Sequence, residues 1–187
     1  MCIRDRFIYF VFGMIVFAIF WLIGTSNRLK RYRIVIDESK RNVDIALAKR
    51  YDTISEMIKV AKSFARHEAD TFANVIKLRQ SGSISEANMN MKDQDDAIHR
   101  IYALAESYPE LKSSEEFLNL QDQIDEENEQ LAAAKRIVNN NISIFNQEIV
   151  SFPASLVAKS NGMTQMDFLF EEDLTKKKKV DNFDYEV

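Results

Sequence analysis

The sequence predicts an all-α protein in which an N-terminal transmembrane helix continues into an elongated antiparallel helical bundle of three long helices plus a short C-terminal helix. Glycine (4) and proline (2) are scarce among the 187 residues, which favours long, uninterrupted helices. Two stretches repeat apolar residues at heptad spacing, a pattern typical of helices that pack along each other. A long apolar run precedes the first of these stretches.

Residues 1–6 read Met-Cys-Ile-Arg-Asp-Arg and have two interpretations. They resemble the peptide that is translated from sequencing-adapter DNA at the edge of an assembled fragment. Alternatively, they are a short charged region ahead of an apolar segment. Cys2 is the single cysteine, so the sequence excludes an intrachain disulfide and a thiolate metal cluster.

Residues 7–26 are predicted to cross a membrane as a helix. Residues 7–23 carry no charge, and the whole stretch is long enough for a hydrocarbon core of roughly 30 Å. Tyr9 and Trp21 lie toward its ends, where aromatic rings favour the membrane interface. A buried core helix would be less uniformly apolar, a cleaved signal peptide would be shorter, and a lipoprotein signal would need a following cysteine. We therefore expect the lipid bilayer to be a partner through residues 7–26.

Basic residues follow the apolar run directly. Residues 27–41 have a net charge of +4 while the whole chain has −4, so the body that follows is acidic. A basic segment beside an apolar run is typical of a membrane-proximal region, and the positive-inside rule places the body in the cytoplasm. No nucleic acid partner is expected, because phosphate binding requires a basic face.

The first long helix is expected to continue from the apolar run, because neither glycine nor proline occurs from residue 25 to residue 81. Gly82 then suits a left-handed helix cap. The apolar positions begin with Tyr32, Val35 or Ile36, and Val43. The heptad pattern itself comprises Leu47, Tyr51, Ile54, Ile58, Ala61, Ala65, Glu68, Phe72, Val75 and Arg79.

A second helix is predicted over residues 85–107, beginning at Ser85 and Glu86. Its apolar positions are sparse before Ile98, and Pro109 ends it because proline disfavours helix in the preceding residue. Those apolar positions are Met91, Ile98, Ile101, Tyr102 and Ala105.

The third long helix is predicted over residues 114–151, with Ser113 or Ser114 as its N-cap. Its length makes it the natural antiparallel partner of the first heptad pattern. One of its rows comprises Phe117, Ile124, Leu131, Val138, Phe145 and Phe152, and the companion row comprises Leu120, Glu127, Ala134, Asn141 and Glu148.

The C-terminal part begins at Pro153, which ends the third helix. Residues 154–159 are expected to add a short helical turn that Asn161 and Gly162 end. A last apolar patch should then dock on the bundle, and residues 171–187 are predicted to be a disordered charged tail. The patch comprises Met163, Met166, Phe168, Leu169 and Phe170.

The sequence predicts no catalytic, cofactor-binding or metal site. His67-Glu68 begins like a zincin motif, but the second histidine of that motif is absent. Asp70 could share a helix face with His67, yet a catalytic zinc needs a third ligand, and His99 is the only other histidine. The acids of residues 125–129 lack the loop and glycine of a calcium site, so they indicate a solvated helix face.

Polar residues interrupt both heptad patterns. Glu68 and Arg79 do so in the first, and Glu127 and Asn141 do so in the second. Polar residues at such positions commonly specify the register of two helices at some cost in stability. We interpret Glu68 in this way.

Several groups of residues, in order and with their spacings kept, resemble the LemA family. The most distinctive group is Tyr108-Pro109-Glu110-Leu111-Lys112, followed by Phe117, Leu120 and Gln121. Others are Arg41-Asn42-Val43-Asp44, Lys49-Arg50-Tyr51-Asp52, Ala65 with His67-Glu68, Ala132, Ala134, Lys135-Arg136, Asn139, Phe145-Asn146, Ile149, Phe152-Pro153, Leu156, Ala158, Gly162 and Phe168. The chain departs from the family at Leu47, where a tryptophan is usual, at Glu127-Asn128-Glu129, and at Val138 and Phe145, where tyrosines are usual.

The resemblance covers residues 27–170, which we interpret as a LemA-like helical bundle. It implies a single-pass bacterial membrane protein and no agreed molecular activity. We expect a membrane-anchored scaffold or interaction protein of the cell envelope, located in the inner membrane, with protein partners or self-association and no catalytic activity. The alternatives are a regulator of an envelope protease or other membrane enzyme, and a cryptic enzyme. Lipid-anchored relatives have bodies outside the cytoplasm, so the side of the membrane stays open.

Overall fold

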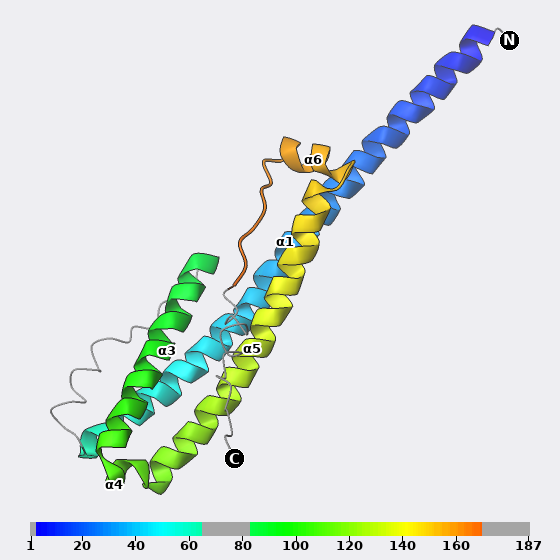
Figure 1. The fold of residues 1–187 in the computed structure, drawn as a ribbon. Helices are drawn as coiled ribbons and strands as arrows, with labels where there is room; N and C mark the ends of the chain where they lie inside the picture. Colours follow the sequence, from blue (N-terminus) through cyan, green and yellow to red (C-terminus); the bar gives the residue numbers. More distant parts are fainter. Residues whose placement is uncertain (1–2, 65–82, 170–187) are drawn as a thin grey trace, which may run out of the picture.

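A computed structural model describes residues 3–64 and 83–169, with side chains from residue 9 onward. The described residues form helices and no strands, which confirms the predicted all-α class (Figure 1). The helices are α1 (Ile3–Phe64), α3 (Ile84–Ser107), α4 (Pro109–Lys112), α5 (Glu115–Val150) and α6 (Ala154–Ser160).

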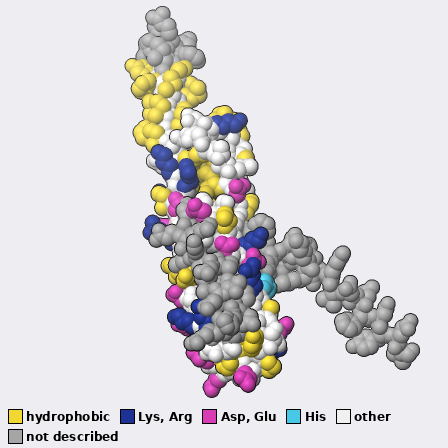
Figure 2. All heavy atoms as spheres, turned by 90° about the vertical axis from the view of Figure 1, so that its left-hand side faces the viewer, with side chains coloured by type: hydrophobic (Ala, Val, Ile, Leu, Met, Phe, Trp, Pro, Cys, Tyr) yellow, Lys and Arg dark blue, Asp and Glu magenta, His cyan; other side chains and the backbone are white. Residues whose placement is uncertain are grey.

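Helix α1 is a single helix of 62 residues that connects the apolar run to the bundle without a break. It is the one helix in the described ranges that is long and apolar enough to cross a membrane. Figure 2 shows its apolar side chains standing clear of the body, with Lys and Arg side chains where the body begins. The second half of the predicted heptad pattern, from Ala65 to Arg79, lies outside the described residues, as does Gly82.

Helix α5 packs antiparallel along α1, as the sequence predicts (Figure 1). The contact reaches back to Leu29, so it begins well before Leu47, where the predicted heptad pattern starts. Five of the six residues in its first predicted row are buried: Phe117, Ile124, Leu131, Val138 and Phe145. The sixth, Phe152, was wrongly placed in that row. It is 83% exposed, because α5 ends at Val150 and the chain turns before Phe152 can reach α1.

The buried stripe of α1 is centred one position away from the predicted pattern. Leu47, Ile54, Ile58 and Ala61 are buried, but Tyr51 lies at the edge. The stripe is wide because α1 packs against α5 on one side and α3 on the other. Its central row is Leu29, Ile36, Val43, Arg50 and Met57, each at most 4% exposed.

Helix α3 runs parallel to α1 and covers the half of the bundle that lies away from the apolar run (Figure 1). We call this half distal and the half next to the apolar run proximal. Its N-cap is Ser83 and its first residue is Ile84, so the helix begins one residue earlier than predicted. The Ser83 side chain accepts from the Glu86 backbone N–H, and the Glu86 carboxylate accepts from the Ser83 N–H, which forms a capping box.

The turn between α3 and α5 contains a short helix that is absent from the sequence-based prediction. Tyr108 ends α3, and Pro109 occupies the first position of α4, where its missing N–H is harmless. Leu111 of α4 is fully buried in the distal core. Ser114 then caps α5, accepting from the Phe117 N–H at 3.2 Å.

The chain after α5 returns along the bundle. Helix α6 ends at Ser160 with Asn161 as its C-cap, and Gly162 follows with φ of +63°, a left-handed conformation that suits glycine. Residues 163–169, which we call the strap, then run extended along α5, with Leu169 buried and Met163 and Met166 packed on the core. Phe168 packs less closely than its neighbours, with half of its surface exposed. Phe170 lies outside the described residues.

Replacing Ile124 with alanine should destabilise the protein by about 2–5 kcal/mol, because this fully buried side chain fills the contact between α1 and α5. Urea unfolding of the full-length protein, followed by circular dichroism, measures the change. Ile137→Ala on the same helix is the matched control, because Ile137 is 52% exposed and should change stability by less than about 0.5 kcal/mol. Equal losses in the two variants would contradict the described packing.

Candidate functional site

A layer of polar side chains crosses the core where α1, α3 and α5 meet. Arg50 on α1 donates from Nη2 to Asp95 Oδ1 on α3 at 2.5 Å. Three residues further along α1, Thr53 Oγ1 donates to Glu127 Oε1 on α5 at 2.9 Å. The spacing of Arg50 and Thr53 places both on one face of α1, so this face is linked to both neighbouring helices. We call Arg50, Thr53, Asp95 and Glu127 the polar layer.

Glu127 lies inside the bundle, with 8% of its surface exposed. Burial raises the pKa of its carboxyl group above the ordinary value, because the charged form loses hydration. The hydrogen bond from Thr53 and the charges of Arg50 and Lys49 oppose that rise. Its second oxygen, Oε2, has no hydrogen-bond partner among the described residues. Thr53 therefore holds the carboxyl group in place, but its single hydrogen bond replaces only part of the hydration that the group loses on burial.

Arg50 supplies the positive charge of the layer. Its side chain is buried while that of Asp95 is partly exposed, so the ion pair reaches from the core to the surface. Burial and the nearby Asp125 raise the pKa of Tyr102 on α3, and the charge of Arg50 partly opposes that rise. The Nε of Arg50 has no hydrogen-bond partner among the described residues.

Gln94 adds a further contact between α1 and α3. Its Nε2 donates to the backbone carbonyl oxygen of Leu47 at 2.9 Å, and the side chain is buried. The buried amide of Gln94 thus lies in the core together with the carboxyl, hydroxyl and guanidinium groups of the polar layer. Since Arg50, Thr53 and Glu127 are all less than 9% exposed, the arrangement is suited to specifying helix register rather than to meeting a substrate.

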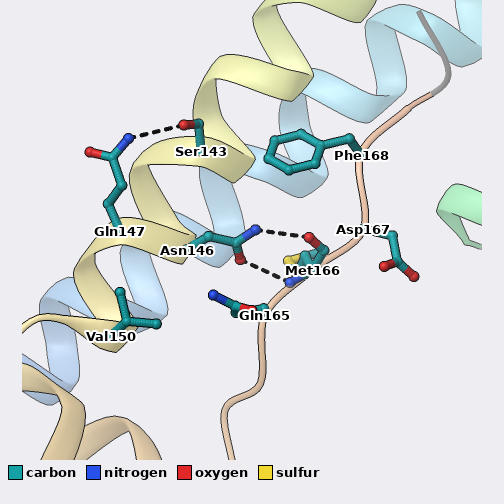
Figure 3. A pocket seen from close by; sticks show the side chains of 8 residues that line it. All are labelled: Ser143, Asn146, Gln147, Val150, Gln165, Met166, Asp167 and Phe168. Atoms are coloured by element: carbon teal, nitrogen blue, oxygen red, sulfur yellow. Dashed lines mark hydrogen bonds between the residues drawn. The ribbon is translucent and has the colours of Figure 1, made fainter.

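A shallow open groove of about 470 Å³ lies between α5 and the strap (Figure 3). Two asparagines of α5 hold the strap. Asn146 donates from Nδ2 to the Met166 carbonyl and accepts at Oδ1 from the Met166 N–H, both at 2.8 Å. Asn139 makes the same pair of bonds with Leu169, at 3.0 and 2.8 Å.

The spacing of these two asparagines explains why the strap fits. Asn139 and Asn146 are one heptad apart, a rise of about 10.5 Å along a helix. Met166 and Leu169 are three residues apart, a span of about 10 Å in an extended chain. Each asparagine amide thus occupies the place of a neighbouring strand's peptide group.

The groove contains few groups that could perform chemistry. Ser143 Oγ accepts from Gln147 Nε2 at 3.1 Å, and Asp167 is the single ionisable residue of its lining. Figure 3 shows the carboxylate of Asp167 pointing away from Ser143 and Asn146.

Several residues singled out from the sequence have a defined place. His99 is exposed on α3, and Asp125, Glu126 and Glu129 lie on a solvated face as predicted. Glu127 points into the core, as its place in the companion heptad row predicts, and does not share the solvated face assigned to residues 125–129. His67, Glu68 and Asp70 lie outside the described residues. Within residues 3–64 and 83–169, no three His, Cys, Asp or Glu side chains gather closely enough to hold a metal ion.

Sequence reasoning missed Arg50, Thr53, Gln94 and Asp95. A signal for Arg50 was present, because it continues the seven-residue row of Leu29, Ile36 and Val43. No such signal exists for Gln94 and Asp95, since the polar first half of α3 gives no indication of which side faces α1. Asn139 and Asn146 were noted only as residues shared with a family.

Comparison with known proteins gives one consistent result. A family model described as the LemA family matches residues 39–182. The chain is similar to Protein LemA of Metamycoplasma hominis, with 23% identity over 162 residues that cover 83% of this chain and 74% of the relative.

The stability difference between wild type and Glu127→Gln should depend on pH. A raised pKa in the folded state means that the folded protein binds a proton more tightly than the unfolded chain. As the pH rises through and above about 4.5, the ordinary value for this group, wild type should therefore lose a contribution to stability that the glutamine variant does not lose. Urea midpoints measured across this pH range test the expectation. The exposed Glu129→Gln should keep the wild-type profile, and a constant difference between wild type and Glu127→Gln would contradict the assigned environment.

Asn146→Ala should loosen the strap. The substitution removes two hydrogen bonds to Met166, which costs about 1–3 kcal/mol of local stability. Hydrogen exchange at the Met166 amide should become faster, while exchange in the α1 core stays unchanged. Asn140→Ala, at an exposed position on the same helix, is the control. Unchanged exchange at Met166 would show that Asn146 does not hold the strap.

Proposed function

This chain belongs to the LemA family, and from this premise we propose that it is a membrane-anchored helical scaffold of the bacterial inner membrane, without catalytic activity. Residues 7–26 cross the bilayer once in this proposal, and the bundle presents its outer faces to protein partners or to other copies of the chain. The observation that carries the proposal is the continuity of α1, whose first part is bare and apolar and whose second part is the core of the bundle.

The bare part of α1 supports membrane anchoring. Phe10, Phe17 and Phe20 are each at least 70% exposed, and the other described apolar residues of residues 9–23 are largely uncovered. Removing a phenylalanine side chain from water is worth about 1.5–3 kcal/mol, so this surface is unfavourable in water and favourable in lipid. About 20 helical residues span about 30 Å, which matches the hydrocarbon core.

The basic residues that follow support the same position for the boundary. Lys30, Arg31 and Arg33 are exposed directly after the apolar run. Arg28 forms an ion pair with Glu148 near the end of α5, so the bundle begins within one turn of the proposed boundary. Cationic side chains at this position meet the headgroups of anionic lipids favourably.

The outer faces of the bundle support a role in protein contact. Ile34 and Ile45 lie eleven residues apart on the side of α1 that faces away from α5, and each is more than half exposed. Ile137 and Ile144 are exposed one heptad apart on α5. From residue 27 to residue 64 the helix is about 57 Å long, so these faces extend far from the membrane.

Site-specific photocrosslinking in cells tests the proposal. A photoreactive phenylalanine analogue replaces Ile137 or Ile144 in the full-length protein, and the neighbouring exposed Arg136 is the matched control. We expect discrete adducts with one or a few membrane proteins, or with a second copy, from the two isoleucine positions and not from the control. Alkaline carbonate extraction should leave the protein in the membrane pellet.

Two results would count against the proposal. Release of the protein by carbonate would contradict membrane anchoring. Retention without any adduct from either isoleucine position would contradict the scaffold role.

A further inference from the structure

Helix α6 lies across the end of the α1·α5 pair, at the level where the apolar run of α1 ends (Figure 1). Val157 and Ala158 of α6 belong to the same buried cluster as Leu29, and Trp21 packs against that cluster. Asn161 Nδ2 donates to Ser26 Oγ at 3.4 Å. Because Ser26 is the last residue of the proposed span, these contacts place α6 beside the end of that span.

The segment that contains α6 turns its small residues inward and its large apolar residues outward. Ala154, Val157 and Ala158 are buried, whereas Leu156 is 60% exposed. Phe152, just before the helix, is the most exposed of the large hydrophobic residues in the described part of the chain. A segment surrounded by water favours the opposite arrangement, since exposed apolar surface is unfavourable there.

The charges around this segment suit an anionic surface. Residues 149–166 contain Lys159 and no acidic residue. The acid that precedes them, Glu148, is paired with Arg28. Lys30 and Arg31 add further positive charge directly after the proposed span. Segments that combine large apolar side chains with lysine or arginine bind at the boundary between lipid headgroups and acyl chains.

We propose that Phe152 and Leu156 insert into the headgroup region of the same bilayer that α1 crosses, with Lys159 at the anionic headgroups. This inference rests on the proposed membrane anchoring of α1. Lipid is the occupant that the observations favour, because α6 is attached to α1 at the end of the span and carries no acidic residue. A single spanning helix leaves the bundle free to rotate about the helix axis, and this second attachment holds it in one orientation.

Tryptophan fluorescence in vesicles tests the proposal, because Trp21 is the single tryptophan of the chain. The full-length protein is reconstituted in vesicles of phosphatidylcholine and phosphatidylglycerol, with or without lipids brominated near the start of the acyl chain. Wild type reports on the span through Trp21. Two double variants, Trp21→Phe with Phe152→Trp and Trp21→Phe with Leu156→Trp, report on α6. A third, Trp21→Phe with Leu118→Trp, is the control at the distal end of α5, where the side chain is 46% exposed.

We expect brominated lipid to quench the fluorescence of wild type and of both α6 variants, with a blue-shifted emission, and to leave the Leu118→Trp variant unquenched. Quenching of Trp21 without quenching at positions 152 and 156 would overturn the α6 contact and leave the anchoring intact. A blue shift at those positions without quenching would overturn it in favour of a protein partner or a second copy. Loss of quenching at Trp21 would overturn the anchoring itself. Unchanged circular dichroism shows that each variant is folded.

Discussion

The packing of α5 along α1 is the interaction on which the other elements depend. Two long helices with matching apolar stripes bury a continuous core from Leu29 near the apolar run to Ala61 at the far end. Helix α3 is mostly polar on its outer side and covers only the distal half of this pair. The strap and α6 cover the proximal half. Without the contact between α1 and α5, these covering elements would have no apolar surface on which to pack.

A long helical pair needs a device that specifies its register, because apolar side chains tolerate sliding by a turn or a heptad. The polar layer supplies that device. A slide of α5 along α1 would separate Thr53 from Glu127 and leave a buried carboxyl group without its hydrogen bond. A slide of α3 would separate Arg50 from Asp95. Such groups contribute little net stability, but they make alternative registers costly.

The proximal half of the bundle is arranged around the boundary between the apolar run and the body. Asn139 and Asn146 hold the strap through its backbone, so the residues of the strap can vary while its path stays the same. That path begins at α6, which is itself attached to α1 beside Ser26. The strap, α6 and α1 are therefore connected to one another where the proposed span meets the bundle.

The sequence by itself determined the helical class, the long first helix and the pairing of residues 114–151 with it. These features follow from local and periodic properties: the scarcity of glycine and proline, the heptad spacing, and the serine cap at Ser114. The core row from Phe117 to Phe145 was predictable for the same reason.

Only the tertiary structure decided which face of α1 lies at the centre, because two neighbours widen its buried stripe and the single-seam pattern cannot show this. Only the tertiary structure decided which side of α3 faces α1, because the polar first half of this helix has no periodic pattern of apolar residues. The pairing of the buried Glu127 with Thr53 also depends on a neighbour far away in the chain. Periodicity describes one helix against one partner, whereas the polar layer and the α6 surface arise where three elements meet.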